Sequence, residues 1–181
     1  VRSRDIIVWL PPGYNDNVNR YPVLYMHDGQ NIFDPLTSAF GVDWQVDEIA
    51  DSLIRIRSIY PIIIVGIYNT PERSNEYMHN DTGRAYMKFI TDELKPFIDI
   101  NYYTLPDRDN TATAGASLGG LISFMLAWEY PEIFSKAACI SPAFKIESID
   151  YVSQVKKYSG VKKQIKFYFV SGGIGLEKKL Q

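Results

Sequence analysis

A serine between two glycines is the feature of this sequence that most clearly suggests chemistry. The pentapeptide Gly-Ala-Ser-Leu-Gly at 115–119 directly follows an apolar run and precedes a segment of helical character at 121–130. A serine on a tight turn from strand to helix can act as a nucleophile, because its hydroxyl is presented clear of the sheet and the glycines let neighbouring backbone pass close. The helix start would favour negative charge beside Ser117. An ordinary Gly/Ser-rich turn is the alternative.

A second segment, His-Asp-Gly-Gln-Asn at 27–31, could supply what such a nucleophile needs. Attack on an ester carbonyl creates an oxyanion, which preorganised backbone N–H groups stabilise. One N–H comes from the residue after the nucleophile, here Leu118, and another from the loop after an earlier strand. We expect Gln30 to provide the second N–H, with Gly29 as the alternative. We interpret His27 and Asp28 as structural.

Short apolar runs alternate with segments of helical period, which is typical of βαβ units around a mostly parallel sheet. The sequence therefore predicts an α/β fold with helices on both faces, formed by residues 1–181 as a single domain. Most of the runs are apolar enough to be central strands. The expected strands are 5–10, 21–27, 61–68, 111–116, 136–140 and 164–170, and apolar residues at helical spacing predict helices over 44–56 and 86–97.

Composition argues against several classes of protein. The chain is 46% hydrophobic with a net charge of -2, which does not fit a disordered chain or a nucleic-acid binder. No apolar stretch approaches the roughly 20 residues that span a bilayer. The single cysteine, Cys139, lies in an apolar run and is expected to be structural. No ligand cluster with metal spacing and no phosphate-binding glycine loop appears, so we predict neither a metal nor an organic cofactor.

Five segments together resemble the esterase D-like family of α/β-hydrolases, which includes feruloyl, acetylxylan and siderophore esterases. The resemblance implies an α/β-hydrolase fold and hydrolysis of carboxylic esters through an acyl-enzyme on Ser117. The substrate would be a small-molecule or carbohydrate-linked ester, and no nucleic acid would be involved. The segments are 8–14, 24–34, 89–98, 115–120 and 140–144, in family order.

Two further residues look like substrate-pocket positions of that family. Trp44 begins the helix expected over 44–56, and Arg73 lies in the segment Arg-Ser-Asn-Glu-Tyr at 73–77. A core tryptophan and a solvated pair between Arg73 and Glu76 are the alternatives.

The sequence departs from the family in its catalytic triad, which should follow the order serine, acid, histidine. Both histidines, His27 and His79, precede Ser117. The resemblance implies that the acid follows the last strand-like run, which makes Glu177 the candidate, with a solvated glutamate as the alternative. We also expect the sequence to be truncated before the final strand and histidine loop. The fragment would then be nearly inert, because a serine without a base is a weak nucleophile.

Two other functions stay open at this point. The chain could be a non-catalytic binding module with an α/β-hydrolase-like fold, in which the histidine is truly absent. It could also be an acyltransferase that passes the acyl group to an alcohol, using the same residues.

Overall fold

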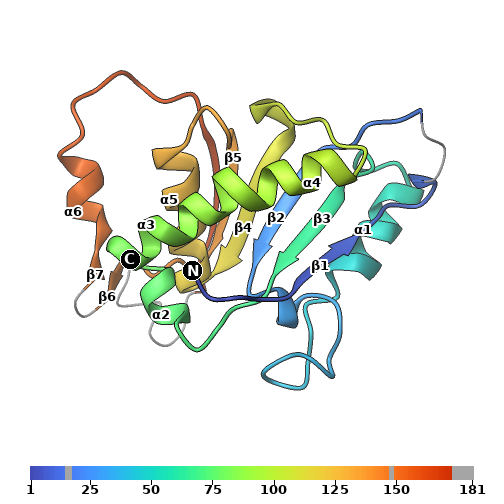
Figure 1. The fold of residues 1–181 in the computed structure, drawn as a ribbon, viewed down its shortest axis with the longest axis horizontal. Helices are drawn as coiled ribbons and strands as arrows, with labels where there is room; N and C mark the ends of the chain where they lie inside the picture. Colours follow the sequence, from blue (N-terminus) through green and yellow to red (C-terminus); the bar gives the residue numbers. More distant parts are fainter. Residues whose placement is uncertain (15–17, 147–148, 173–181) are drawn as a thin grey trace.

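The computed structural model describes residues 1–14, 18–146 and 149–172. Its main element is a six-stranded sheet in the order β1-β3-β2-β4-β5-β8 (Figure 1). Neighbouring strands are parallel except β1 and β3, which are antiparallel. The predicted α/β class with a mostly parallel sheet is confirmed. The strands are β1 (Ile6–Trp9), β2 (Val23–His27), β3 (Ile63–Ile67), β4 (Thr111–Ala116), β5 (Lys136–Ile140) and β8 (Lys166–Val170), beside a hairpin of β6 (Lys145–Ile146) and β7 (Ile149–Asp150).

Helices cover both faces of the sheet, as the sequence predicted. Side chains alternate along β2, so that Tyr25 faces the core formed with α3, α4 and α5 while Met26 faces the smaller core formed with α1. No helix among the described residues has the length and apolar character to cross a membrane. The helices are α1 (Val46–Arg55), α2 (Arg73–Glu76), α3 (Asp81–Lys88), α4 (Lys95–Asn101), α5 (Leu118–Glu129) and α6 (Tyr151–Lys156).

The connections place a topological switch point between β2 and β4. These strands are adjacent and parallel, but the chain leaves β2 for α1 on one face and leaves β4 for α5 on the other. In open α/β sheets, ligands bind in the crevice at the carboxyl ends of strands where the connections diverge in this way. The segments at 27–31 and 115–119 both lie at that edge.

One helical stretch is longer than the sequence pattern indicated. Instead of 86–97, a continuous helical rod runs from α3 through a π-helical turn at Phe89–Leu94 into α4 (Figure 1). It begins earlier because the Asn80 side chain accepts a hydrogen bond from the Gly83 N–H at 2.8 Å and caps the first turn. Pro96 has no N–H to donate to the preceding turn. Directly before this residue, the hydrogen bonding changes from that of the π-helical turn to that of α4.

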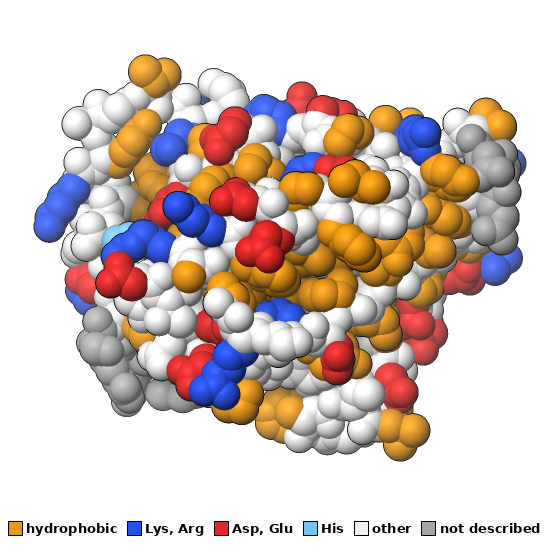
Figure 2. All heavy atoms as spheres, viewed as in Figure 1, with side chains coloured by type: hydrophobic (Ala, Val, Ile, Leu, Met, Phe, Trp, Pro, Cys, Tyr) orange, Lys and Arg blue, Asp and Glu red, His pale blue; other side chains and the backbone are white. Residues whose placement is uncertain are grey.

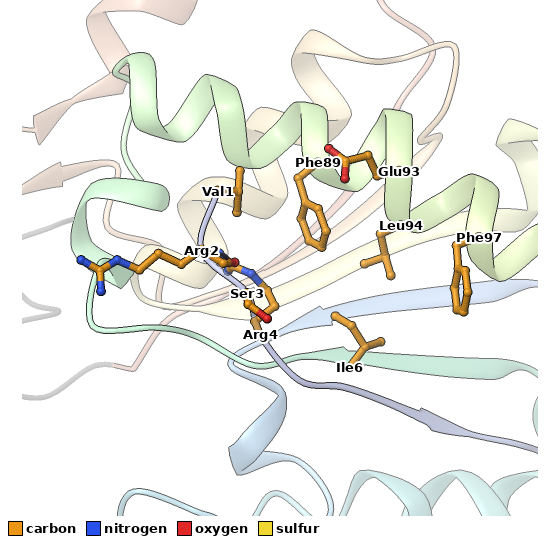
Figure 3. A pocket seen from close by; sticks show the side chains of 9 residues that line it. All are labelled: Val1, Arg2, Ser3, Arg4, Ile6, Phe89, Glu93, Leu94 and Phe97. Atoms are coloured by element: carbon orange, nitrogen blue, oxygen red, sulfur yellow. Dashed lines mark hydrogen bonds between the residues drawn. The ribbon is translucent and has the colours of Figure 1, made fainter.

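A pocket of about 570 Å³ lies between the N-terminal segment and the helical rod. Figure 2 shows apolar side chains gathered around this hollow, and Figure 3 shows Phe89, Leu94 and Phe97 facing Ile6 across it. None of the predicted site residues lines this pocket, so it is not the place where the sequence predicts serine chemistry. On the sheet itself, Cys139 is buried as expected, and burial raises the pKa of its thiol to about 12.

A buried ion pair ties the N-terminal segment to α2. Arg4 and Glu76 form this pair with side chains only 1% and 2% exposed. The guanidinium also lies over the rings of Tyr86 and Phe89, and Glu76 accepts a hydrogen bond from Thr70. A pair this buried is costly to break by removing one partner, because the remaining charge has no solvent to stabilise it.

We therefore expect Arg4→Met to lower the free energy of unfolding by about 3–5 kcal/mol, measured by urea denaturation. The double variant Arg4→Met/Glu76→Gln should lose less, because it leaves no unpaired charge. Equal losses in the single and double variants would show that the charge itself is not what stabilises this contact.

Candidate active site

Ser117 occupies a strained turn between β4 and α5. Its φ of 57° and ψ of -121° are unusual for a residue with a side chain, and it is exposed at the N-cap of α5. The turn is held by backbone hydrogen bonds: the Ser117 N–H donates to the Ile140 carbonyl at 2.9 Å, and the Ser117 carbonyl accepts from Ala143 at 3.1 Å. In this turn the Ser117 side chain is exposed at the N-terminal end of α5, a helix of twelve residues, where the helix dipole is positive.

The two glycines of the pentapeptide let this turn close. A Cβ at Gly115 would lie 2.5 Å from the Gly119 carbonyl oxygen, which is closer than any side chain could tolerate. A Cβ at Gly119 would lie 3.2 Å from Oδ2 of Asp28 and 3.5 Å from Cβ of His27. The turn after β4 therefore packs directly on the segment that ends β2.

The two predicted oxyanion donors lie on either side of this contact. Leu118 is the first residue of α5, where helical N–H groups have no acceptor within the helix. Gln30 lies in a 3-10 turn, Gly29–Asn31, that follows β2. Gly29 packs so tightly on β3 that a Cβ there would meet the Gly66 carbonyl carbon at 2.5 Å. The geometry brings both segments to one edge of the sheet, and the roles of Leu118, Gln30 and Gly29 stay predictions.

His27 is buried beneath this edge and is bonded at both ring nitrogens. Nδ1 lies 2.9 Å from Oη of Tyr86, and Nε2 lies 3.2 Å from Oγ1 of Thr113. Burial lowers the pKa of His27 from the usual 6.5 to about 4, and the nearby Arg73 and Arg4 act in the same direction against the opposing effect of Asp28. His27 is therefore neutral near pH 7 and joins β2 to β4 and α3.

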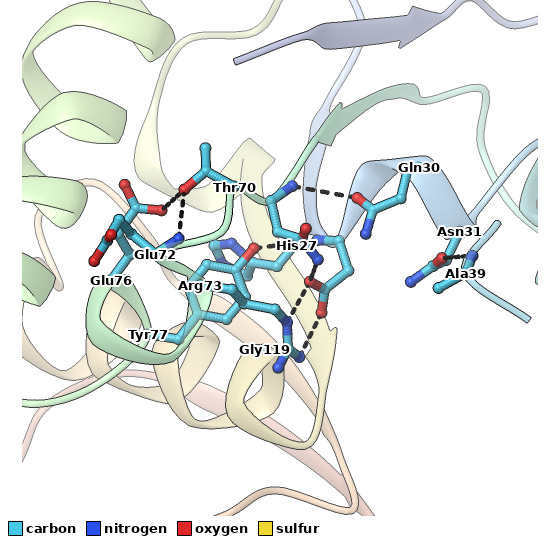
Figure 4. A network of polar contacts seen from close by, with 12 residues as sticks. His27, Gln30, Asn31, Ala39, Thr70, Glu72, Arg73, Glu76, Tyr77 and Gly119 are labelled. Carbon is cyan, nitrogen blue, oxygen red and sulfur yellow. Dashed lines mark hydrogen bonds and ion pairs between the residues drawn. The ribbon is translucent and has the colours of Figure 1, made fainter. Parts of the chain in front are cut away.

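Asp28 is the centre of a polar network that the sequence did not reveal (Figure 4). Its carboxylate accepts hydrogen bonds from Nε of Arg73 at 2.6 Å, from Nη2 of Arg73 at 2.8 Å and from Nδ2 of Asn69 at 2.6 Å. The Asn69 N–H also donates to Oε1 of Gln30 at 3.2 Å. More than forty positions separate Asp28 from these partners, so no local pattern could have indicated the network.

The other predicted site residues have different surroundings. Trp44 is 36% exposed, and its backbone N–H donates to the Asn31 carbonyl at 2.9 Å, which joins the loop before α1 to the 3-10 turn. Arg73, predicted as a substrate-pocket residue, binds Asp28, while Glu76 binds Arg4, so the alternative of a solvated pair between Arg73 and Glu76 is wrong. Glu177, the predicted acid, lies outside the described residues.

Three carboxylates at the start of α1 are the one group among the described residues that could hold a metal ion. The ligand atoms of Asp43, Asp47 and Glu48 lie within 4.8 Å of one another. Two of these residues lie in the first turn of α1, where the helix dipole stabilises negative charge without an ion. We assign no role to this cluster.

Comparisons with known proteins agree on one family. The sequence profile described as "Putative esterase" matches residues 1–173. An endo-1,4-beta-xylanase/feruloyl esterase from Xylanibacter ruminicola is 33% identical over 135 residues, covering 70% of this chain and 18% of that protein. The ferri-bacillibactin esterase of Bacillus subtilis is 27% identical over 168 residues, covering 76% of this chain and 55% of that protein. The chain thus spans little more than half, or less, of these relatives.

The fold also matches a solved structure. An IroE-like serine hydrolase from Shewanella oneidensis superposes with a TM-score of 0.73 at 22% identity, covering 92% of this chain and 55% of that one. At this level of identity the match bears on the fold alone, which is that of the α/β-hydrolases.

The buried histidine generates a prediction about stability and pH. The unfolded chain binds a proton at His27 near pH 6.5 and the folded chain near pH 4, so the free energy of unfolding should fall as pH decreases through this window. The slope due to His27 should reach about 1.4 kcal/mol per pH unit. Urea denaturation at several pH values should show a shallower slope in His27→Gln, which cannot titrate. Identical slopes in both proteins would contradict a neutral, buried His27.

Proposed function

The chain belongs to the family described as "Putative esterase", and from this premise we propose that it is a serine-dependent carboxylic ester hydrolase that acts through an acyl-enzyme on Ser117. The observation that carries the proposal is the strained, exposed position of Ser117 between β4 and α5. The elbow faces the segment after β2, at the switch point where ligands bind in such sheets.

The proposed reaction has two halves. The Oγ of Ser117 attacks the ester carbonyl and gives its proton to a base, while the N–H groups of Leu118 and Gln30 stabilise the oxyanion. The carbon–oxygen bond to the alcohol breaks, the base returns the proton to the leaving oxygen, and an acyl-enzyme forms. Water then attacks the acyl carbon while the same base accepts its proton. The bond between the acyl carbon and Oγ breaks and the base gives its proton to Oγ, which releases the acid and restores Ser117.

The base of this mechanism is neither histidine of the sequence. Both ring nitrogens of His27 have buried partners. The Nε2 of His79 lies 3.7 Å from Oε1 of Glu129, at the opposite end of α5 from Ser117. A helix of that length measures roughly 18 Å, so His79 is out of reach. The proposal therefore requires a histidine contributed from outside these 181 residues, with Glu177 after β8 as the acid that orients it.

The names of two relatives support a proposal for the substrate class. One is named as a feruloyl esterase and another as a ferri-bacillibactin esterase, so their names span carbohydrate-associated and siderophore esters. We propose a small-molecule or carbohydrate-linked ester for this protein.

The test uses the natural full-length protein with a fluorophosphonate probe and p-nitrophenyl acetate. Ser117→Ala should abolish covalent labelling and reduce ester hydrolysis by at least roughly 10⁴-fold, because the nucleophile is lost. Ser52→Ala, at an exposed serine on α1, serves as the matched control and should behave as the wild type.

The result also separates the alternatives. A folded full-length protein that neither labels nor hydrolyses esters would refute the hydrolase and favour a binding module. Labelling at Ser117 with products formed mainly on an added alcohol would instead identify an acyltransferase.

A further inference from the structure

We propose that Asp28 and Arg73 are positioning residues of this site, and that their ion pair fixes the turn that carries the Gln30 amide. The inference rests on the proposed function and deepens it. It makes the second oxyanion donor depend on a side chain from α2, which contributes no atom to the reaction. The sequence had suggested that Arg73 contacts substrate, whereas the structure directs its guanidinium to Asp28 (Figure 4).

The backbone at Asp28 needs such a constraint. Asp28 has φ 59° and ψ 45°, a left-handed conformation that residues with a side chain adopt at a cost in free energy. This residue is the hinge between β2 and the 3-10 turn Gly29–Asn31, so its conformation sets the direction of the Gln30 N–H. The bidentate contact with Arg73 holds the carboxylate in a fixed plane, and the Asp28 N–H donates to Oη of Tyr77 at 3.3 Å.

Asn69 extends this constraint to the other side of Gly29. Its side chain donates to Asp28 while its backbone N–H donates to the Gln30 side chain. The residues on both sides of Gly29 are thus held by the segment between β3 and α2. Gly29 itself is pressed against the β3 backbone, so the turn has little freedom to tilt.

Charge provides a second reason for the pair. The Asp28 carboxylate is only 9% exposed and lies against Gly119, two residues from Ser117. An unpaired carboxylate at this place would repel the oxyanion that develops during attack, and the low dielectric would strengthen the repulsion. Arg73 neutralises that charge. Its side chain is 29% exposed, so it lies at the margin of the site, with two of its N–H groups committed to Asp28.

The test measures the rate constant for fluorophosphonate labelling of Ser117, and kcat and KM for one neutral and one anionic ester, in the natural full-length protein. Arg73→Met should lower the labelling rate and kcat by roughly 10- to 100-fold for both esters, with KM changed less than about twofold, because a transition-state interaction is lost. Arg73→Lys should recover part of the rate, since a lysine restores charge without the bidentate contact.

Asp28→Asn and the double variant Asp28→Asn/Arg73→Met test whether the effects of Asp28 and Arg73 on the labelling rate depend on each other. If the unpaired carboxylate contributes to the defect, the double variant Asp28→Asn/Arg73→Met should react faster than Arg73→Met alone. Arg2→Met is the matched control, because it also removes an arginine from an ion pair. Arg2 pairs with Glu72, the residue before Arg73, and these side chains are 61% and 36% exposed. It should leave the labelling rate unchanged.

The outcomes separate this inference from the proposed function. Labelling of the wild type at Ser117 together with an unchanged labelling rate in Arg73→Met would overturn the inference while the hydrolase stands. A rise in KM for the anionic ester alone would overturn it as well, because Arg73 would then bind substrate. Failure of the wild type to label would remove the hydrolase and the inference together.

Asn69→Ala keeps the proposal testable if Arg73→Met does not fold, as judged by circular dichroism. It removes one hydrogen bond to Asp28 and retains the backbone bond to Gln30. We expect a several-fold loss in labelling rate, and a folded Asn69→Ala with the wild-type rate would count against the positioning role.

Discussion

The site depends on how closely the backbone segments at the carboxyl ends of β2 and β4 approach each other. Gly115 and Gly119 let the turn after β4 fold back on itself, and Gly119 packs against the last residue of β2 and the first residue after it. Gly29 lies closer still to β3, where a Cβ would be 2.5 Å from the Gly66 carbonyl carbon. A side chain at Gly115 or Gly29 would collide with neighbouring backbone, and one at Gly119 would crowd Asp28, so small residues are what bring Ser117 and the segment after β2 to one edge of the sheet.

Two strained residues survive at this edge because the surrounding structure holds them in place. Ser117 and Asp28 both have positive φ values, and each is fixed by hydrogen bonds from segments distant in sequence. Beneath them, His27 is kept neutral by burial and bonded to Thr113 and Tyr86. This buried layer joins β2, β4 and α3 directly beneath the two residues with positive φ.

The short helix α2 links the site to the rest of the molecule through two ion pairs. Its first residue, Arg73, binds Asp28 beside the elbow, while its last, Glu76, binds the buried Arg4 ahead of β1. A helix of four residues has little stability of its own, so these contacts keep it in position. Through Asp28, the segment after β2 is therefore tied to charges that lie far along the chain.

The sequence by itself determined the α/β class, the bounds of β4 and β5, and the presence of a serine elbow, because periodicity and glycine spacing are local signals. It missed the start of the helical rod at Asp81, which depends on the Asn80 cap, and it did not indicate α2 or α6. Only the tertiary structure decided that Arg73 faces Asp28 and Glu76 faces Arg4. Such pairs form between residues far apart in the chain, where burial and the fold, not spacing, choose the partner.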